Sequence, residues 1–128
     1  MIAGTGIDLV EVGRIIQELE KHGKSFVKKI FTKAEIEYCE QKTNIAIRAQ
    51  HYAGRFAAKE AFFKAIGTGW RGGIHWNDVE VINDQLGKPG LNLNGKAVEI
   101  IEKMEVNSIH ISISHTKNTA IAIVILEN

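Results

Sequence analysis

The fold follows from the stretch GRFAAKEAFFKA at residues 54–65, which forms the second half of the longest predicted helix. This helix is expected over residues 45–66, with Thr43 and Asn44 capping its start and Gly67 ending it. At about 100° per residue, a group of side chains within roughly 60° of Phe56 forms a core-facing stripe. Its members are Ile45, Ala49, Tyr52, Ala53 and Phe63.

Glu60 falls inside this apolar stripe, and Lys64 falls on its edge. An unpaired carboxylate on a buried helix face is costly, so Glu60 needs a partner. Lys64, one turn further along the helix, is one candidate by spacing.

The remaining pattern predicts an α+β fold with a mainly antiparallel sheet packed on the long helix. No linker divides the chain, so residues 1–128 are expected to form a single domain. The expected elements are strands at 2–10, 79–82 and 91–93, helices at 11–22, 33–41 and 95–105, and a final hairpin of 109–114 and 119–126. Gly23 is expected to end the first helix, and a capping box of Thr32 and Glu35 begins the second.

Composition excludes several classes of protein. The chain is 45% hydrophobic and 24% charged, with a net charge of +1, so its overall charge does not favour nucleic acid or a membrane surface as a partner. The single cysteine, Cys39, excludes an intrachain disulfide and a multi-thiolate metal site. No signal peptide and no apolar run of about 20 residues is visible, so a cytoplasmic location is expected.

Asp8 is a second misplaced carboxylate, because aspartate is depleted in strands. It could cap the following helix, or it could share a site with Glu60 if the first strand lies beside the long helix. Two neighbouring carboxylates repel one another unless one is protonated or a cation lies between them. Mg²⁺ is bound by one or two carboxylates plus substrate phosphates, and Lys64 could meet the phosphate charge.

Three further features each have two interpretations. A basic cluster in the N-terminal third, which includes Arg14, Lys21 and Lys24, is either a solvated face or a docking surface for an acidic partner. The glycine-rich segment 67–73 is either a connector or a loop that approaches a ligand. His115, at the end of a half-polar strand, is more often structural or exposed than catalytic.

Three segments together resemble the short bacterial holo-acyl-carrier-protein synthase family of 4′-phosphopantetheinyl transferases. They are GIDLVE at 6–11, GRFAAKEA at 54–61 with Lys64-Ala65 and GTG at 67–69, and SISHT at 112–116. Their order and spacing match the family over essentially the whole chain. The resemblance implies the 4′-phosphopantetheinyl transferase fold and transfer of 4′-phosphopantetheine from coenzyme A to a serine of apo-acyl carrier protein, in fatty acid biosynthesis. The other product is adenosine 3′,5′-bisphosphate.

The resemblance also implies roles for individual residues. Asp8 and Glu60 would bind Mg²⁺, with Lys64 beside the phosphates, and these three would form the catalytic group. Glu60 is also the better candidate for the general base. The coenzyme A site would be formed by Arg55, Phe56, Lys64, Gly67, Gly69, Lys88, Pro89, Ser114, His115 and Thr116.

The resemblance further implies a homotrimer with its active site in a cleft between subunits. Arg14, Lys21 and Lys24 would dock the acidic acyl carrier protein. Two rival functions use the same residues: a Mg²⁺-dependent phosphohydrolase, and a nucleotide-binding or oligomer-forming module without turnover.

Overall fold

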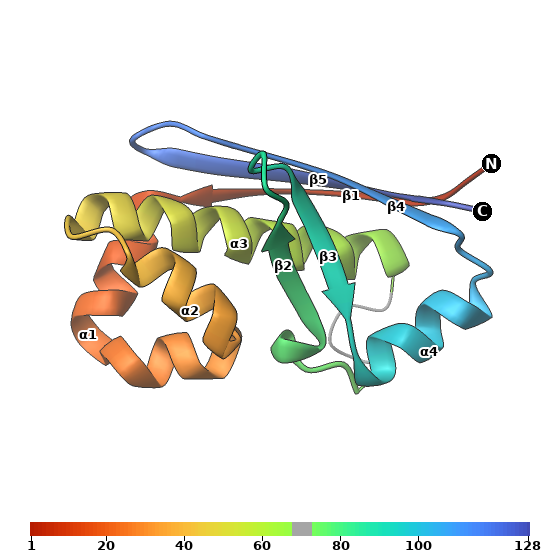
Figure 1. Cartoon of the computed structure of the whole chain (residues 1–128), viewed down its shortest axis with the longest axis horizontal. Coiled ribbons are helices and arrows are strands. Elements are labelled where there is room, and N and C mark those ends of the chain that lie inside the picture. Colours follow the sequence, from red (N-terminus) through yellow and green to blue (C-terminus); the bar gives the residue numbers. More distant parts are fainter. Residues whose placement is uncertain (68–72) are drawn as a thin grey trace.

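The computed structural model describes residues 1–67 and 73–128 (Figure 1). The elements run β1 (Ile2–Glu11), α1 (Val12–Ile30), α2 (Lys33–Glu40), α3 (Ile45–Ile66), η2 (Trp76–Asp78), β2 (Val79–Asn83), β3 (Pro89–Leu93), α4 (Gly95–Lys103), β4 (Ser108–His115) and β5 (Thr119–Glu127). The predicted α+β class is confirmed, and every strand pairing in the described part of the chain is antiparallel.

The main sheet has the order β1-β5-β4, so β5, whose residues 120–126 are all apolar, is its central strand. One face of this sheet packs on α3, which runs beneath β1 and β5 in Figure 1. The strands β2 and β3 form a separate two-stranded ribbon. Asp8 lies on β1 opposite Ala122 of β5, so it is on the face that looks toward α3.

Helix α3 forms where the capping residues predict. The Asn44 side chain accepts hydrogen bonds from the backbone N–H groups of Ala46 and Ile47, and Gly67 ends the helix in the left-handed region with φ 81°. Most of the predicted stripe is buried, but Phe56 is only partly buried and Ile45, at the start of the helix, is 39% exposed. Ile45 was therefore wrongly predicted to be a core residue, because the first turn of the helix lies at the end of the core.

Two glycines allow β1 to lie directly against α3. A Cβ atom on Gly6 would be 1.9 Å from the Ala61 carbonyl oxygen, and one on Gly4 would be 2.2 Å from that of Ala65. Backbone therefore contacts backbone here, as only glycine permits. Since Asp8 is two residues beyond Gly6 on the same face, this contact brings its carboxylate to the helix.

The first helix differs from the prediction. Gly23 does interrupt the helical backbone, with φ 45°, but a second helical segment continues to Ile30. Val27 and Ile30 of that segment are buried, so the chain resumes the helix because its apolar side chains pack in the core.

A buried ion pair ties the surrounding elements to α3. The Lys59 amine is fully buried and lies 2.6 Å from Oε1 of Glu35. It also donates to the carbonyl oxygens of Ile30 and Trp76, at 2.9 and 3.1 Å. The second Glu35 oxygen accepts from the backbone N–H of Val81. One side chain next to Glu60 thus joins α1, α2, η2 and, through Glu35, β2.

The outer face of the main sheet carries exposed aliphatic side chains. Ile7 and Leu9 of β1 are 55% and 64% exposed and pair across the ladder with Ile123 and Ile121 of β5. None of the helices in the described part of the chain is long and apolar enough to span a membrane.

Candidate active site

The structure brings Asp8, Glu60 and Lys64 together at the contact of β1 with α3; we call this group the carboxylate cluster. The Lys64 amine donates at 3.0 Å to Oδ1 of Asp8 and also to the Ile7 carbonyl oxygen. The expected pairing of Lys64 with Glu60 by helical spacing is thus replaced by a bond to a residue far away in sequence. The capping alternative for Asp8 is wrong, because the N-cap of α1 is Glu11 and it has no side-chain capping bond.

Electrostatics show that the two carboxylates are neighbours. Burial, followed by the charge of Asp8, raises the pKa of Glu60 above its usual value, while Lys64 acts in the opposite direction. The Asp8 side chain is 16% exposed and that of Lys64 is 54% exposed, so the cluster opens to solvent. A cation or an incoming ligand can reach these oxygens from outside.

A second site is a small cavity of about 150 Å³ between α2, α3, β2, β3 and β4, which we call the arginine pocket. The residues that define it include Tyr38, His51, Arg55, Asn83, Pro89 and His115. None of the described residues that line it is acidic.

Arg55 is 5% exposed and is held on two sides in the arginine pocket. Its guanidinium carbon lies 3.9 Å from the Tyr38 ring centroid, and Nη2 donates to Oδ1 of Asn83 at 2.6 Å. Its buried Nε has no hydrogen-bond partner among the described residues. A buried donor without an acceptor is costly, so an acceptor supplied by a ligand would be favourable.

The two sites lie on opposite sides of α3. Arg55 and Glu60 are five residues apart, which places them about 140° apart around the helix axis, and Arg55 and Lys64 are about 180° apart. The residues predicted to bind one coenzyme A molecule are therefore divided between two faces of this protomer.

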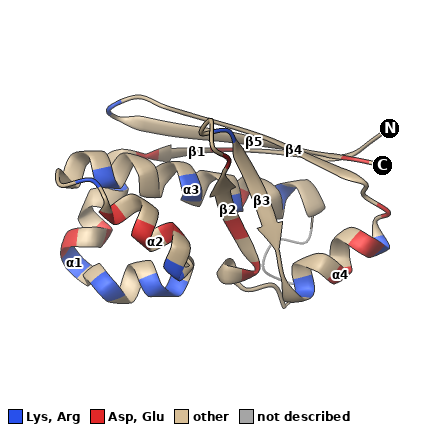
Figure 2. Ribbon diagram, viewed as in Figure 1, with Lys and Arg blue, Asp and Glu red and all other residues tan. Residues whose placement is uncertain are grey.

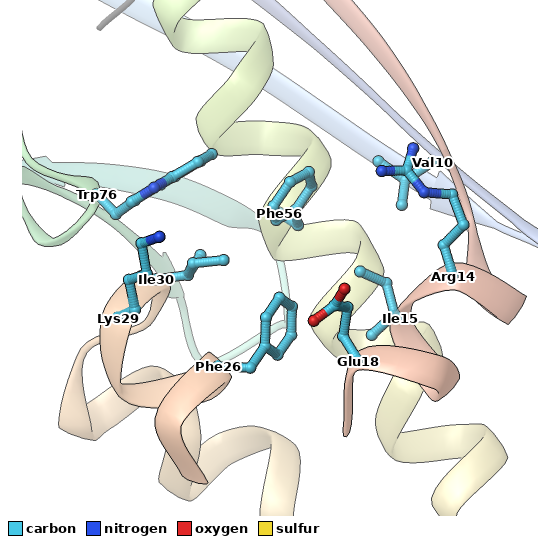
Figure 3. A pocket seen from close by; sticks show the side chains of 9 residues that line it. All are labelled: Val10, Arg14, Ile15, Glu18, Phe26, Lys29, Ile30, Phe56 and Trp76. Atoms are coloured by element: carbon cyan, nitrogen blue, oxygen red, sulfur yellow. The ribbon is translucent and has the colours of Figure 1, made fainter. Parts of the chain in front are cut away.

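A third cavity, of about 560 Å³, separates α1 from α3, and we call it the α1 pocket (Figure 3). Phe56 and Trp76 form one wall, with rings stacked at 5.2 Å. Arg14, Glu18 and Lys29 bring charged groups to its rim. Its apolar lining comprises Val10, Ile15, Phe26, Ile30, Phe56 and Trp76. Phe56, predicted to be in the coenzyme A site, therefore faces a different cavity from Arg55.

The SHT turn is divided in the same way. His115 lines the arginine pocket, whereas Ser114 pairs with Ile121 and lies on the outer face of the sheet. The Thr116 hydroxyl accepts from the backbone N–H groups of Asn118 and Thr119 and so stabilises the turn. Lys88 is exposed beside Pro89.

Gly67 is the C-cap of α3, while Gly69 and most of the glycine-rich segment lie outside the described residues. Of the predicted docking residues, Arg14 lines the α1 pocket, and Lys21 and Lys24 are exposed further along α1, where Figure 2 shows several basic residues. Lys24 follows the Gly23 kink and lines a separate cavity of about 330 Å³.

Sequence reasoning did not identify Tyr38, His51 and Asn83 as site residues. His51 is four residues before Arg55 and hence on the same helix face, a signal that could have identified it. No local pattern identifies Tyr38 or Asn83, because α2 and β2 bring them in from distant parts of the chain.

Comparison with known proteins identifies the family of this chain. Residues 4–124 match the family model of the 4′-phosphopantetheinyl transferase superfamily. The chain is 53% identical over 127 residues to a holo-[acyl-carrier-protein] synthase of Syntrophus aciditrophicus, covering 99% of this chain and 97% of the relative.

Two solved structures also match over nearly their whole length. The holo-[acyl-carrier-protein] synthase of Neisseria meningitidis superimposes with a TM-score of 0.85 at 33% identity, covering 100% of both chains. The synthase of Bacillus anthracis, in complex with CoA (3′,5′-ADP), gives 0.82 at 38% identity, covering 99% of this chain and 97% of that one. This chain therefore belongs to the 4′-phosphopantetheinyl transferase superfamily.

Proposed function

We propose that this protein transfers the 4′-phosphopantetheine group of coenzyme A to a serine hydroxyl of an apo-acyl carrier protein, in fatty acid biosynthesis. The observation that supports this most directly is the carboxylate cluster, where Asp8 and Glu60 meet beside Lys64. The identity of about 50% with holo-[acyl-carrier-protein] synthases over the whole chain supports the same reaction.

The chemistry of the carboxylate cluster fits a divalent cation. Asp8 and Glu60 offer only oxygen donors, and burial followed by the charge of Asp8 raises the pKa of Glu60. No set of three or more His, Cys, Asp or Glu side chains suited to a metal occurs among the described residues. A site of two carboxylates completed by phosphate oxygens and water is one that Mg²⁺ accepts, and Mn²⁺ has the same ligand preference. When bound, the ion would neutralise the diphosphate and make its phosphorus more electrophilic.

The protein's own groups would do the remaining work. Lys64, more than half exposed at the side chain, can leave Asp8 to meet the phosphate charge that develops in the transition state. Glu60, with its raised pKa, would accept the serine proton directly or through a water molecule. The serine oxygen forms a bond to the phosphorus that carries pantetheine. The bond from that phosphorus to the 5′-phosphate of adenosine 3′,5′-bisphosphate breaks. No covalent intermediate with the enzyme is needed.

We assign the nucleotide half of coenzyme A to the arginine pocket, where the unpaired Nε of Arg55 offers a buried donor. Pro89 and His115 line the same pocket. The assignment extends to Lys88 and Thr116, which are their neighbours in the chain. Because this pocket and the carboxylate cluster lie on opposite sides of α3, one coenzyme A molecule would contact two protomers.

The exposed aliphatic face of the main sheet supports such an assembly with further copies of this chain. A sheet face that exposes Ile7 and Leu9 at more than half of their surface is typical of an interface. A homotrimer would bury this face and bring Ser114, which lies on it, close to a neighbouring protomer. A cytoplasmic location is part of the proposal.

The α1 pocket suits the carrier protein. Its apolar floor and the cations Arg14 and Lys29 would receive an acidic surface with apolar side chains, and Lys21 and Lys24 would extend the contact. Glu18 also lies on this rim, so the surface is mixed rather than uniformly basic.

Incubation with coenzyme A and Mg²⁺ but no carrier protein separates the transferase from a phosphohydrolase. A transferase releases little adenosine 3′,5′-bisphosphate until apo-carrier protein is added, whereas a hydrolase releases it at once. Release at the same rate with and without carrier would overturn the proposal. A module without turnover would release none under either condition.

A further inference from the structure

One buried amine links two residues that line the α1 pocket. Ile30 is the last residue of α1 and Trp76 is the first residue of η2, and both line this pocket. Figure 3 shows their side chains at the end of the pocket away from Arg14. The Nζ atom of Lys59 donates to the Ile30 carbonyl oxygen at 2.9 Å and to that of Trp76 at 3.1 Å. The distance between the two oxygens therefore cannot exceed the sum of these two bonds.

The Lys59 amine uses its whole hydrogen-bonding capacity in this position. An ammonium group has three N–H donors, and its three acceptors here are the two carbonyl oxygens and Oε1 of Glu35, at 2.6 Å. The Ile30 carbonyl belongs to the last turn of α1, where free acceptors and a cation suit one another. Since the Lys59 side chain is fully buried, a bound carrier cannot touch it. Any effect of Lys59 on the reaction must act through the residues that it bonds.

Stability alone does not explain a buried lysine here. Removal of an ammonium and a carboxylate from water costs several kcal/mol per ion, and well-packed apolar residues of similar volume are often at least as stable as a buried ion pair. Methionine at Lys59 and leucine at Glu35 would fill comparable space. They cannot donate to two carbonyl oxygens from different elements. The specific contribution of Lys59 is therefore the link between α1 and η2.

The wall that α1 contributes to the pocket depends on this link. Gly23 interrupts the helical backbone, so the first part of α1 does not rigidly orient the segment that follows. Phe26, Lys29 and Ile30, all from this second segment, line the pocket. The segment thus has a break in the helix at one end and the hydrogen bond to Lys59 at the other.

The opposite wall is fixed to α3 by its ring contacts. The Trp76 ring stacks on Phe56 and meets Phe63 edge-on, with centroids 5.2 Å apart in both pairs. Because Lys59 lies on the same helix as both phenylalanines, its bonds fix the end of α1 relative to this wall. Hydrogen bonds set distance and direction more narrowly than apolar contacts do.

We propose that Lys59 is a positioning residue for the carrier protein, which holds the segment after Gly23 against Trp76 and so sets the width of the α1 pocket. The proposal rests on the proposed function, because that function assigns the α1 pocket to the carrier. Without these bonds the segment adopts several orientations, and the fraction of molecules that can bind the carrier falls. If that fraction falls to about a tenth, the apparent Kd for the carrier rises about tenfold.

Two variants separate positioning from stability. The double variant Lys59→Met with Glu35→Leu removes both charges together, so it keeps most of its stability, but the two carbonyl oxygens lose their common donor. In Glu35→Gln the side-chain oxygen can still accept from Lys59, which keeps its bonds to both carbonyls while its charge loses its partner. We therefore expect a stable double variant with weak carrier binding, and a destabilised Glu35→Gln variant with normal carrier binding.

Carrier binding is measured by isothermal titration calorimetry, with an apo-carrier protein in which alanine replaces the acceptor serine. At a temperature where all the proteins are folded, the Kd should rise about tenfold in the double variant and stay within about twofold of wild type in Glu35→Gln. In the transfer assay, the KM for carrier should rise likewise in the double variant, with kcat and the KM for coenzyme A unchanged.

Hydrogen exchange provides a readout without the carrier. The Phe31 backbone N–H bonds the Val27 carbonyl oxygen at 2.8 Å, at the end of the segment that Lys59 holds. This amide should exchange faster in the double variant than in Glu35→Gln, although the double variant is the more stable protein. The reverse order would contradict the positioning role.

The outcomes distinguish this inference from the function on which it rests. If the double variant binds the carrier as tightly as wild type, or if Glu35→Gln loses as much affinity as the double variant, this inference alone is overturned. An equal rise in the KM for coenzyme A would also overturn it. If the wild-type protein neither binds nor modifies the carrier, both the inference and the proposed function are wrong.

Discussion

Gly6→Ala tests how the carboxylate cluster is built. The added Cβ would lie 1.9 Å from the Ala61 carbonyl oxygen and 2.7 Å from the Ala65 backbone nitrogen. Both are backbone atoms of α3, so neither can rotate away, and β1 must separate from the helix by more than 1 Å to restore ordinary contact. Overpacking of this kind costs about 1–3 kcal/mol, and the rigid backbone places this case at about 3 kcal/mol or more.

The same shift should impair activity beyond its effect on stability. Asp8 is two residues further along β1 and bonds Lys64 at 3.0 Å, so the displaced strand moves Asp8 away from Glu60. A misplacement of about 1 Å at a reacting centre can cost about 100-fold in rate. We therefore expect at least a 100-fold loss of transfer at a temperature where the variant is folded.

Urea unfolding and a transfer assay measure the two effects. The control is Gly13→Ala on α1, where a Cβ would meet no atom within 4 Å and φ is not positive. Alanine is favoured over glycine in a helix, so Gly13→Ala should raise the free energy of unfolding by roughly 0.5–1 kcal/mol. If the free energy of unfolding of Gly6→Ala lies within about 0.5 kcal/mol of the wild-type value, the direct backbone contact between β1 and α3 is refuted.

Four further variants test the carboxylate cluster, the docking surface and the buried ion pair. Glu60→Gln should lower the rate of transfer by about 100-fold or more. It should also stabilise the free protein at pH 7. The pKa of Glu60 is raised in the folded state, so the wild-type protein loses stability as the pH rises above about 4.5. Urea unfolding at pH 4.5 and 7 checks this, and a less stable variant at pH 7 would contradict it. Arg14→Glu with Lys21→Glu should raise the KM for carrier protein about tenfold and leave that for coenzyme A unchanged. An equal rise in both constants would place these cations at the nucleotide site. Lys59→Met should destabilise by about 3–5 kcal/mol by leaving the Glu35 carboxylate unpaired, and Glu35→Leu in the same chain should recover most of this in urea unfolding. A cost below about 1 kcal/mol for Lys59→Met alone would contradict the described pair.

Local signals explain what the sequence could predict. The bounds of α3 follow from Asn44 and Gly67, which act through bonds within a few residues of themselves. The strand β4 follows from the alternation of isoleucine with polar residues over 109–114, and β5 follows from a run that is apolar on both faces. Asp8 and Glu60 were recognisable because carboxylates are unfavourable at such positions, and that argument does not depend on knowing the partner.

The remaining features depend on contacts between distant residues. Lys59 looks like an ordinary charged helix residue, and only the arrival of Glu35, Ile30 and Trp76 from other elements makes it a buried anchor. The resumption of α1 after Gly23 likewise depends on a core that the helix alone does not specify. The predicted coenzyme A residues Arg55 and Lys64 lie on two faces of α3 because they are nine residues apart, which separates them by about 180° around the helix axis.

The central claim is tested most directly by intact-protein mass spectrometry of an apo-acyl carrier protein incubated with this protein, coenzyme A and Mg²⁺. The account predicts that the carrier gains the mass of one 4′-phosphopantetheinyl group, on its serine, and that Glu60→Gln in the same reaction leaves it in the apo form. A carrier that stays apo with the wild-type protein, or that is modified equally by the Glu60→Gln variant, would contradict it.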